Sequence, residues 1–412
     1  MPKRNLFFTA MLLCATLLAA CSGGSSHSAA PTTAPVDCAG WSAAAPGAAA
    51  PAATVARHDA DACLRLNQVQ VIGTHNSYHF VDKPDLLAAL KAFDKQLGES
   101  IEYNHPVLPV QFSREGVRQI ELDVFADPQG GRYAKRRVLV ALHQPVDSGI
   151  AELNKPGFKV LHAQDVDFNS NCLTFIDCLN AVKGWSNAHK QHLPIAILIE
   201  AKDDPITDPL HMGFVVPPPL TTADFDALDK EIRSVFSPSE MITPDDVRGK
   251  HATLESAVLT RTAWPTLADS RGKVLFLLDQ GDQRTVYLKG HPGLKGRVIF
   301  TNASPGEADA AFVEMNDPNG KNLAEIQKLV REGYIVRTRS DADTVEARAN
   351  DTRTRENAIA SGAQFVSTDY PAPDKAPFPG GYEVTLPGNR AWRCNPVNTG
   401  PACVSSALDT PS

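Results

Sequence analysis

The sequence lacks the excess of positive charge that nucleic-acid-binding proteins carry. Its 40 Lys and Arg residues are outnumbered by 47 Asp and Glu residues, which gives a formal net charge of −7. A nucleic-acid-binding domain needs a basic face to neutralise phosphates, so we expect no nucleic acid partner. Nothing in the sequence indicates a protein partner. Hydrophobic residues make up 43% of the 412 residues, which is enough for a large core.

The N-terminal apolar stretch lacks the length needed to span a bilayer comfortably. Residues 6–20 follow a basic flank and resemble the core of a signal peptide. The stretch ends in Leu-Ala-Ala-Cys, which resembles a bacterial lipobox with Cys21 as the lipidated residue; a simple cleavage site before Cys21 is the alternative. We expect a lipoprotein-type signal peptide over residues 1–21. The protein is then exported, either anchored at the cell envelope (periplasmic or outer surface) or secreted.

Zinc-site spacing is absent too, because no cysteine lies in such a pattern with histidines nearby. Two of the eight cysteines belong to the export signal, and an even number remains, which in an exported chain predicts disulfides. Sequence proximity favours Cys172–Cys178 and Cys394–Cys403 and leaves Cys38–Cys63 by elimination, although six cysteines allow many other pairings.

Residues 22–58 are rich in Ala, Pro, Ser and Gly and contain little that could pack. Such a segment cannot bury enough apolar surface to offset its ordering entropy, so we expect a disordered low-complexity tether. A single catalytic domain is expected over residues 59–375. Residues 376–412 would form a C-terminal extension stapled by Cys394–Cys403.

Apolar runs of strand length alternate with amphipathic helical stretches after the tether, as in a parallel sheet of βα units. We expect strands at 69–73, 118–124, 159–162, 194–201, 273–279, 297–302, 334–339 and 364–369. The clearest helices are expected at 85–97, 174–190, 225–236, 323–332 and 352–361, with Gly333 and Gly362 ending the last two. Eight such repeats predict an α/β fold, a (β/α)8 TIM barrel, with its site at the C-terminal ends of the strands.

Polar side chains stand at the ends of these expected strands. They are His75 and Asn76 after the first strand, Glu121 and Asp123 on the second, His162 on the third, Glu200 on the fourth, Arg337 and Arg339 on the seventh, and Asp369 on the eighth. Crowded oxygen ligands indicate a hard cation, and we favour Ca²⁺ over Mg²⁺. The alternative is that the carboxylates form salt bridges with Arg118, Lys202 or Arg339.

Two histidines, His75 and His162, would flank this cation. Imidazole suits proton transfer near neutral pH. His143 also follows an apolar run, but we interpret residues 138–142 as an insertion hairpin and rank His143 behind His162. The other histidines, among them His79 and His105, are expected to be ordinary polar loop residues.

Four motifs together resemble the calcium-dependent phosphoinositide-specific phospholipase C family, and its bacterial secreted branch most closely. They are Gly-Thr-His-Asn-Ser-Tyr at 73–78, Ile-Glu-Leu-Asp-Val at 120–124, Val-Leu-His-Ala at 160–163 and Ile-Leu-Ile-Glu at 197–200. The resemblance runs from about residue 66 to residue 370, and it implies a TIM barrel.

The resemblance implies a phosphoric diester hydrolase that acts on phosphatidylinositol-type phospholipids at a membrane surface and releases diacylglycerol and an inositol phosphate. It implies that His162 is the general acid and that His75 stabilises the phosphorane, while the general base stays open between His75, Glu121 and Asp123. The calcium ligands that it implies are Asn76, Glu121, Asp123 and Glu200. Lys202 and Arg339 are candidates for binding the substrate phosphate.

Two other functions fit the same pattern. A glycerophosphodiester phosphodiesterase uses a similar barrel, but normally has Arg where Asn76 follows His75 here. A surface lipoprotein could also keep the barrel and only bind an inositol-containing ligand. The apolar loop at 212–219, near the expected mouth of the barrel, would either enter a bilayer or pack flat on the rim.

Overall fold

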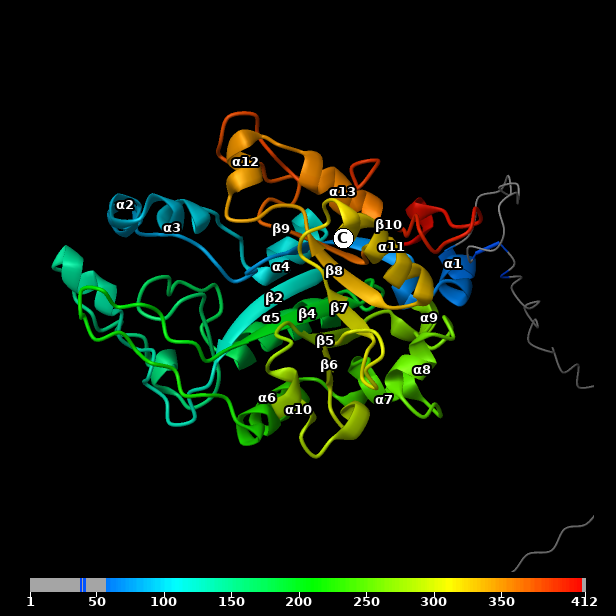
Figure 1. Cartoon of the computed structure of the whole chain (residues 1–412), viewed down its shortest axis with the longest axis horizontal. Helices are drawn as coiled ribbons and strands as arrows, with labels where there is room; N and C mark the ends of the chain where they lie inside the picture. Colours follow the sequence, from blue (N-terminus) through cyan, green and yellow to red (C-terminus); the bar gives the residue numbers. More distant parts are fainter. Residues whose placement is uncertain (1–37, 39, 42–56, 410–412) are drawn as a thin grey trace, which may run out of the picture. The chain divides into compact units, whose positions relative to one another are not determined.

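The computed structural model describes residues 38, 40–41 and 57–409. Eight parallel strands form a nearly closed barrel with helices around it (Figure 1), which confirms the (β/α)8 TIM barrel expected from the sequence. The expected signal peptide with Cys21, and most of the expected tether, lie outside the described residues. No helix in the described part of the chain is long and apolar enough to cross a membrane.

The barrel strands lie in the order β6-β5-β4-β2-β1-β9-β8-β7. They are β1 (Val69–Thr74), β2 (Gln119–Phe125), β4 (Ile195–Lys202), β5 (Val274–Leu278), β6 (Ile299–Thr301), β7 (Phe312–Glu314), β8 (Ile335–Arg339) and β9 (Phe365–Thr368). A parallel bridge between Asn302 and Phe312 links β6 to β7 and nearly closes the ring. Helices cover the outer face, so the strands are buried on both faces and are rich in Val, Ile, Leu and Phe.

The expected third strand is wrong as a barrel strand, and one barrel strand was missed. β3 (Lys159–Val160) is two residues long and runs antiparallel to β2 outside the ring, so β2 pairs directly with β4. The eighth barrel strand is instead β7. It escaped the sequence analysis because it has only three residues and no helix separates it from β6.

The helices lie mostly where the sequence predicts them. They are α1 (Arg57–Cys63), α2 (Pro84–Phe93), α3 (Lys95–Ser100), α4 (Leu108–Val110), α5 (Phe175–Ala188), α6 (Thr222–Val235), α7 (Pro244–Arg248), α8 (Leu254–Val258), α9 (Leu267–Ser270), α10 (Arg284–Leu288), α11 (Lys321–Glu332), α12 (Val345–Ala349) and α13 (Arg353–Ser361). Gly333 and Gly362 end α11 and α13 in the left-handed conformation. The helix expected at 85–97 is two helices, because Asp94 ends α2 and accepts a hydrogen bond from the Leu97 amide to cap α3.

The hairpin expected at 138–142 is wrong. This segment forms the short 3₁₀ helix η3 (Arg137–Leu142), and its Val138 and Leu139 pack in one cluster with Leu86 and Leu90 of α2. The apolar run therefore buries one face against a neighbouring helix and does not pair as strands. His143 follows η3 with an exposed side chain.

Disulfides and packing attach both ends of the described chain to the barrel. The disulfides Cys38–Cys63, Cys172–Cys178 and Cys394–Cys403 are the pairs that the sequence predicted. β10 (Trp392–Cys394) pairs antiparallel with the first three residues of β1 and is not one of the eight barrel strands. Trp41, inside the segment expected to be a tether, is buried in the core, because its large ring supplies the apolar surface that its neighbours lack.

Candidate active site

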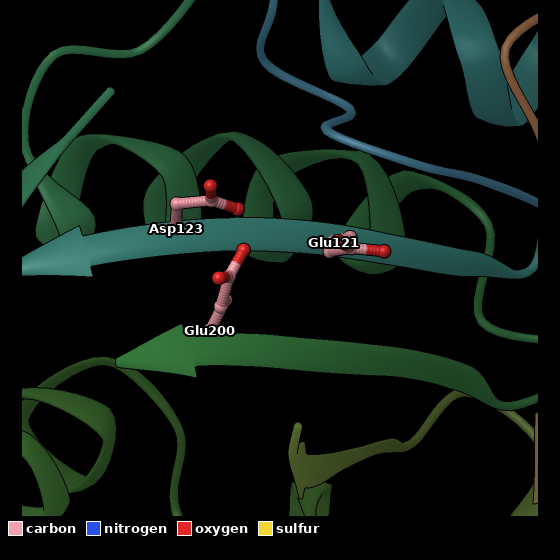
Figure 2. A group of neighbouring side chains, drawn as sticks. All are labelled: Glu121, Asp123 and Glu200. Carbon is pink, nitrogen blue, oxygen red and sulfur yellow. The ribbon is translucent and has the colours of Figure 1, made fainter. Parts of the chain in front are cut away.

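β2 and β4 bring three carboxylates together at the C-terminal end of the barrel (Figure 2). Glu121 and Asp123 are two residues apart on β2 and project to the same side, while Glu200 is the register partner of Asp123 on β4. Ligand oxygens of all three lie within 4.8 Å of one another, and no other such group of His, Cys, Asp or Glu occurs among the described residues. We call these three residues the carboxylate triad. The triad forms because β4 pairs directly with β2, in the place where the sequence analysis expected the strand at 159–162.

The triad fits a calcium ion. Calcium binds oxygen at about 2.3–2.6 Å, so two ligands of one ion can lie roughly 5 Å apart. Asp123 is completely buried, and its Oδ1 has no hydrogen-bond partner. Burial, and then the charge of Glu200, raises the pKa of Asp123 well above its ordinary value, and burial raises the pKa of Glu121 as well. A cation held between these groups would relieve their mutual repulsion.

Lys202 lies against the triad. Its Nζ is 2.7 Å from Asp123 Oδ2 and 3.3 Å from Glu200 Oε2. The salt bridges considered as an alternative to a metal site are therefore present for this lysine. They are absent for Arg118, which pairs with Asp409 at 3.1 Å beside the N-terminal end of β2.

A second cation, Arg337 of β8, lies buried beneath the triad. It pairs with Glu121 and, at 2.6 Å, with Glu314 at the end of β7. Burial, and then the neighbouring Glu314 carboxylate, raises the pKa of Asp279, which follows β5. The ion pairs with Glu121 and Glu314 hold the guanidinium of Arg337 in place.

His75 is anchored by a carboxylate from the last barrel strand. Its Nδ1 is 2.8 Å from Asp369 Oδ1. A carboxylate can only accept, so Nδ1 carries the proton and the neutral ring keeps Nε2 free, 3.8 Å from Glu121 Oε1. Burial, and then the charges of Arg339 and Arg337, lowers the pKa of His75 well below its ordinary value. The free nitrogen of His75 can therefore accept a proton.

Arg339 lies beside this histidine. Its Nη2 is 3.6 Å from Asp369 Oδ2, and its Nε donates to the Asp341 carbonyl at 2.9 Å. The expected role of Arg339 in phosphate binding stays a prediction.

His162 reaches the site although it does not end a barrel strand. β3 runs antiparallel to β2, so the chain beyond Val160 returns along β2 toward Asp123. His162 Nδ1 donates to Asp167 Oδ2 at 2.8 Å, and His79 Nε2 lies 2.9 Å from the same oxygen. Burial acts to raise the pKa of Asp167, but the two histidines lower it below its ordinary value. Asp167 is therefore ionised, and it leaves Nε2 of His162 free.

Asn76 lies in the left-handed conformation, which asparagine tolerates better than most residues. Its Nδ2 donates to the Tyr103 hydroxyl at 2.9 Å, and its Oδ1 accepts from the Tyr78 hydroxyl at 3.3 Å. The backbone N–H of the next residue, Ser77, donates to the Glu121 carbonyl at 3.0 Å, so Asn76 lies next to the strand that carries Glu121 and Asp123. The amide oxygen keeps one lone pair for a further contact.

Sequence reasoning missed several residues that complete the site. Glu314 had a detectable signal, because Phe-Val-Glu at 312–314 repeats the pattern of an apolar run that ends in a carboxylate. Asp167 gave no such signal, since it lies on a loop five residues after His162. His79 and His105 are more than loop residues: His79 contacts Asp167, and His105 Nε2 is 2.9 Å from the His75 carbonyl.

The model of the family described as phosphoinositide phospholipase C, Ca²⁺-dependent, matches residues 64–396. Among solved structures, the chain is similar to a calcium-dependent phosphoinositol-specific phospholipase C from a Gram-negative Pseudomonas species in its apo form, with 17% identity over 81% of this chain and 96% of that chain and a TM-score of 0.49. A Ca²⁺-dependent phosphatidylinositol-specific phospholipase C from Streptomyces antibioticus shares 20% identity over 74% of this chain and 95% of that chain, with a TM-score of 0.44. A search of curated protein sequences gave no significant match.

The segment matched by the family model covers most of the chain. It begins before β1, ends after β10 and includes the carboxylate triad, His75 and His162. The family that it matches is one of enzymes. The chain belongs to the Ca²⁺-dependent phosphoinositide phospholipase C family.

Proposed function

We propose that this chain cleaves phosphatidylinositol-type phospholipids to diacylglycerol and an inositol phosphate, and that its cation is Ca²⁺. One observation carries the proposal: the buried carboxylate triad lies at the same end of the barrel as two histidines, each held by its own aspartate. Cleavage of a phosphodiester needs positive charge at the phosphate, one group that takes a proton and another that gives one. This site offers all three.

The calcium ligands in this proposal are Glu121, Asp123, Glu200 and the amide oxygen of Asn76. When bound, Ca²⁺ would supply the positive charge that stabilises the reacting phosphate and acidifies the attacking hydroxyl. The ligand set contains only oxygen atoms, which favours Ca²⁺ or Mg²⁺ over zinc. The family's calcium dependence favours Ca²⁺.

The two histidines divide the proton transfers. His75, neutral and with Nε2 free near Glu121, takes the proton of the attacking inositol hydroxyl. His162 donates a proton from Nε2 to the leaving glycerol oxygen. Burial, and then Lys202, lowers the pKa of His162, but Asp167 opposes both, and an anionic phosphate beside the ring would favour its protonated form further.

Exposed apolar side chains around the mouth support action at a membrane surface. They are Phe93 of α2, Val140 of η3, and Leu210 and Val216 of the loop after β4, and each is more than half exposed. All three segments follow the C-terminal ends of barrel strands, so they lie on the face that holds the site. Met212 and Phe214 of the same loop pack on the rim, so this loop is partly packed and partly free to contact lipid.

Export and lipidation at Cys21 remain part of the proposal. The three disulfides support export, because disulfides persist in oxidising compartments. A lipid on Cys21 would hold the enzyme at the cell envelope.

The test is product analysis with purified protein and vesicles that contain phosphatidylinositol. We expect diacylglycerol and an inositol phosphate, loss of both products with EDTA, and better recovery with Ca²⁺ than with Mg²⁺. Release of glycerol 3-phosphate from deacylated lipid, with phosphatidylinositol untouched, would identify a glycerophosphodiester phosphodiesterase instead. Binding of inositol phosphate without any cleavage would identify a non-catalytic ligand-binding protein.

A further inference from the structure

Lys202 forms ion pairs with two of the three carboxylates of the triad. It lies two residues after Glu200 on β4, and its ammonium group turns back to the triad, 2.7 Å from Asp123 Oδ2 and 3.3 Å from Glu200 Oε2. The His162 carbonyl, 3.0 Å away, accepts from it as well. Lys202 therefore already makes the contacts with Asp123 and Glu200 that a metal cation would make.

The other cation at the triad cannot move in this way. Arg337 is completely buried and is held by Glu121, Glu314 and the Ser367 hydroxyl. Lys202 has 20% of its side chain exposed. Lys202 also lines a cavity of about 250 Å³ together with His162 and Glu200. A lysine stem is long and flexible, so its ammonium can leave the carboxylates and enter this cavity.

A calcium ion and the Lys202 ammonium cannot share the same oxygens. An ion bound to Asp123 would lie within a few ångströms of an ammonium that is 2.7 Å from the same carboxylate. Like charges a few ångströms apart repel, and they repel more strongly in a partly buried site than in water. In the absence of metal, the same lysine offsets the repulsion between Asp123 and Glu200.

We propose that Lys202 is a tethered competitor of calcium, which neutralises Asp123 and Glu200 in the metal-free enzyme and turns toward the phosphate of the substrate when calcium binds. This inference rests on the proposed function, because it assumes that the triad is the calcium site. Displacing the lysine costs less when a phosphate is present to receive it. Calcium and a phosphate ligand therefore strengthen each other's binding by the same factor.

The first test compares calcium affinity by isothermal titration calorimetry in the full chain and its variants. Lys202→Met removes the competitor, and we expect it to bind Ca²⁺ at least about tenfold more tightly than the unmodified chain. Lys202→Arg keeps the positive charge, and we expect it to bind Ca²⁺ as weakly as the unmodified chain does. Lys328→Met is the matched control, since Lys328 is exposed on α11 and pairs only with Glu325 at 3.1 Å among the described residues.

Equal or weaker calcium binding by Lys202→Met would overturn the proposal while leaving the proposed function intact. Absence of calcium binding in every variant, including the unmodified chain, would contradict both. Thermal unfolding provides a second measurement that tolerates a less stable variant: calcium should raise the Tm of Lys202→Met more than that of Lys328→Met.

The second test begins with the unmodified chain. The calcium affinity of the unmodified chain is measured with and without myo-inositol 1-phosphate, and we expect the phosphate to tighten calcium binding. In Lys202→Met this gain should shrink. An equal gain in both proteins would show that the lysine does not turn toward the phosphate and would contradict that half of the proposal.

Discussion

At the scale of single residues, the aspartate behind each histidine decides which ring nitrogen faces the substrate. Asp369 holds the Nδ1 proton of His75, and Asp167 holds that of His162. Both Nε2 atoms are therefore available for proton transfer. Local sequence pattern pointed to the histidines, because each follows an apolar run. It could not point to Asp167, because that contact depends on how the loop after β3 folds.

Replacing Asp167 by Asn should slow the reaction by about 10²-fold or more in kcat, with little change in KM. The amide keeps a contact with His162 but not the negative charge that supports its protonated form. Loss of that charge also lowers the pKa of His162, so the limb of the pH profile that reports the general acid should move to lower pH. Steady-state kinetics across pH check both effects.

Asp177→Asn is the matched control, since Asp177 is exposed in the first turn of α5. A kcat for Asp167→Asn equal to that of this control would show that Asp167 does not position His162.

At the scale of elements, the pairing of β2 with β4 builds the site, and strand pairing is the feature that sequence reveals least. The strands expected at 118–124 and 194–201 were predicted correctly, because strands buried on both faces are rich in Val, Ile and Leu. The period of two placed Glu121 and Asp123 on one side. Nothing local distinguishes a short antiparallel segment such as Lys159–Val160 from a barrel strand. The triad carboxylates were thus predictable, whereas Glu314 was overlooked despite a similar pattern, because β7 has only three residues.

The packing of α6 against β3 makes stability depend on pH through Glu231. Its Oε1 accepts from the Phe158 amide at 3.1 Å, and burial raises its pKa from 4.5 to about 7. Between these two values the folded chain keeps a proton that the unfolded chain releases, so this group's contribution to stability falls as the pH rises. Glu231→Gln keeps a side chain that can accept the Phe158 bond and does not titrate. We expect the Tm of Glu231→Gln, relative to the unmodified chain, to be higher at pH 8 than at pH 5.

Glu325→Gln on α11 provides the comparison, because Glu325 is exposed. If the Tm difference between Glu231→Gln and the unmodified chain is the same at both pH values, Glu231 does not make stability depend on pH.

At the scale of the whole molecule, one end of the barrel combines a charged interior with an apolar rim. The strands deliver carboxylates, Lys202 and Arg337 to the inside, while α2, η3 and the loop after β4 carry Phe93, Val140 and Val216 on the outside. The net charge of −7 gives no general attraction to an anionic membrane surface. Binding to vesicles should therefore depend on the apolar rim.

Changing Phe93 and Val216 together to Ser should lower activity on vesicles by about tenfold. Activity on soluble glycerophosphoinositol should fall much less, because neither residue contacts the triad or the two histidines. Leu259→Ser is the control, because Leu259 is also exposed but lies at the opposite end of the barrel. Its neighbour Val258 lies beside Gly333, which comes just before the N-terminal end of β8. Equal losses on vesicles and on the soluble substrate would argue against a membrane-binding rim.

In the proposed function, the carboxylate triad holds the calcium on which cleavage depends. The most direct measurement is the calcium concentration that gives half-maximal cleavage of phosphatidylinositol by the unmodified chain and by Asp123→Asn, which removes one charged ligand. We predict that this concentration rises at least about tenfold in the variant. An unchanged calcium requirement in Asp123→Asn would contradict the account.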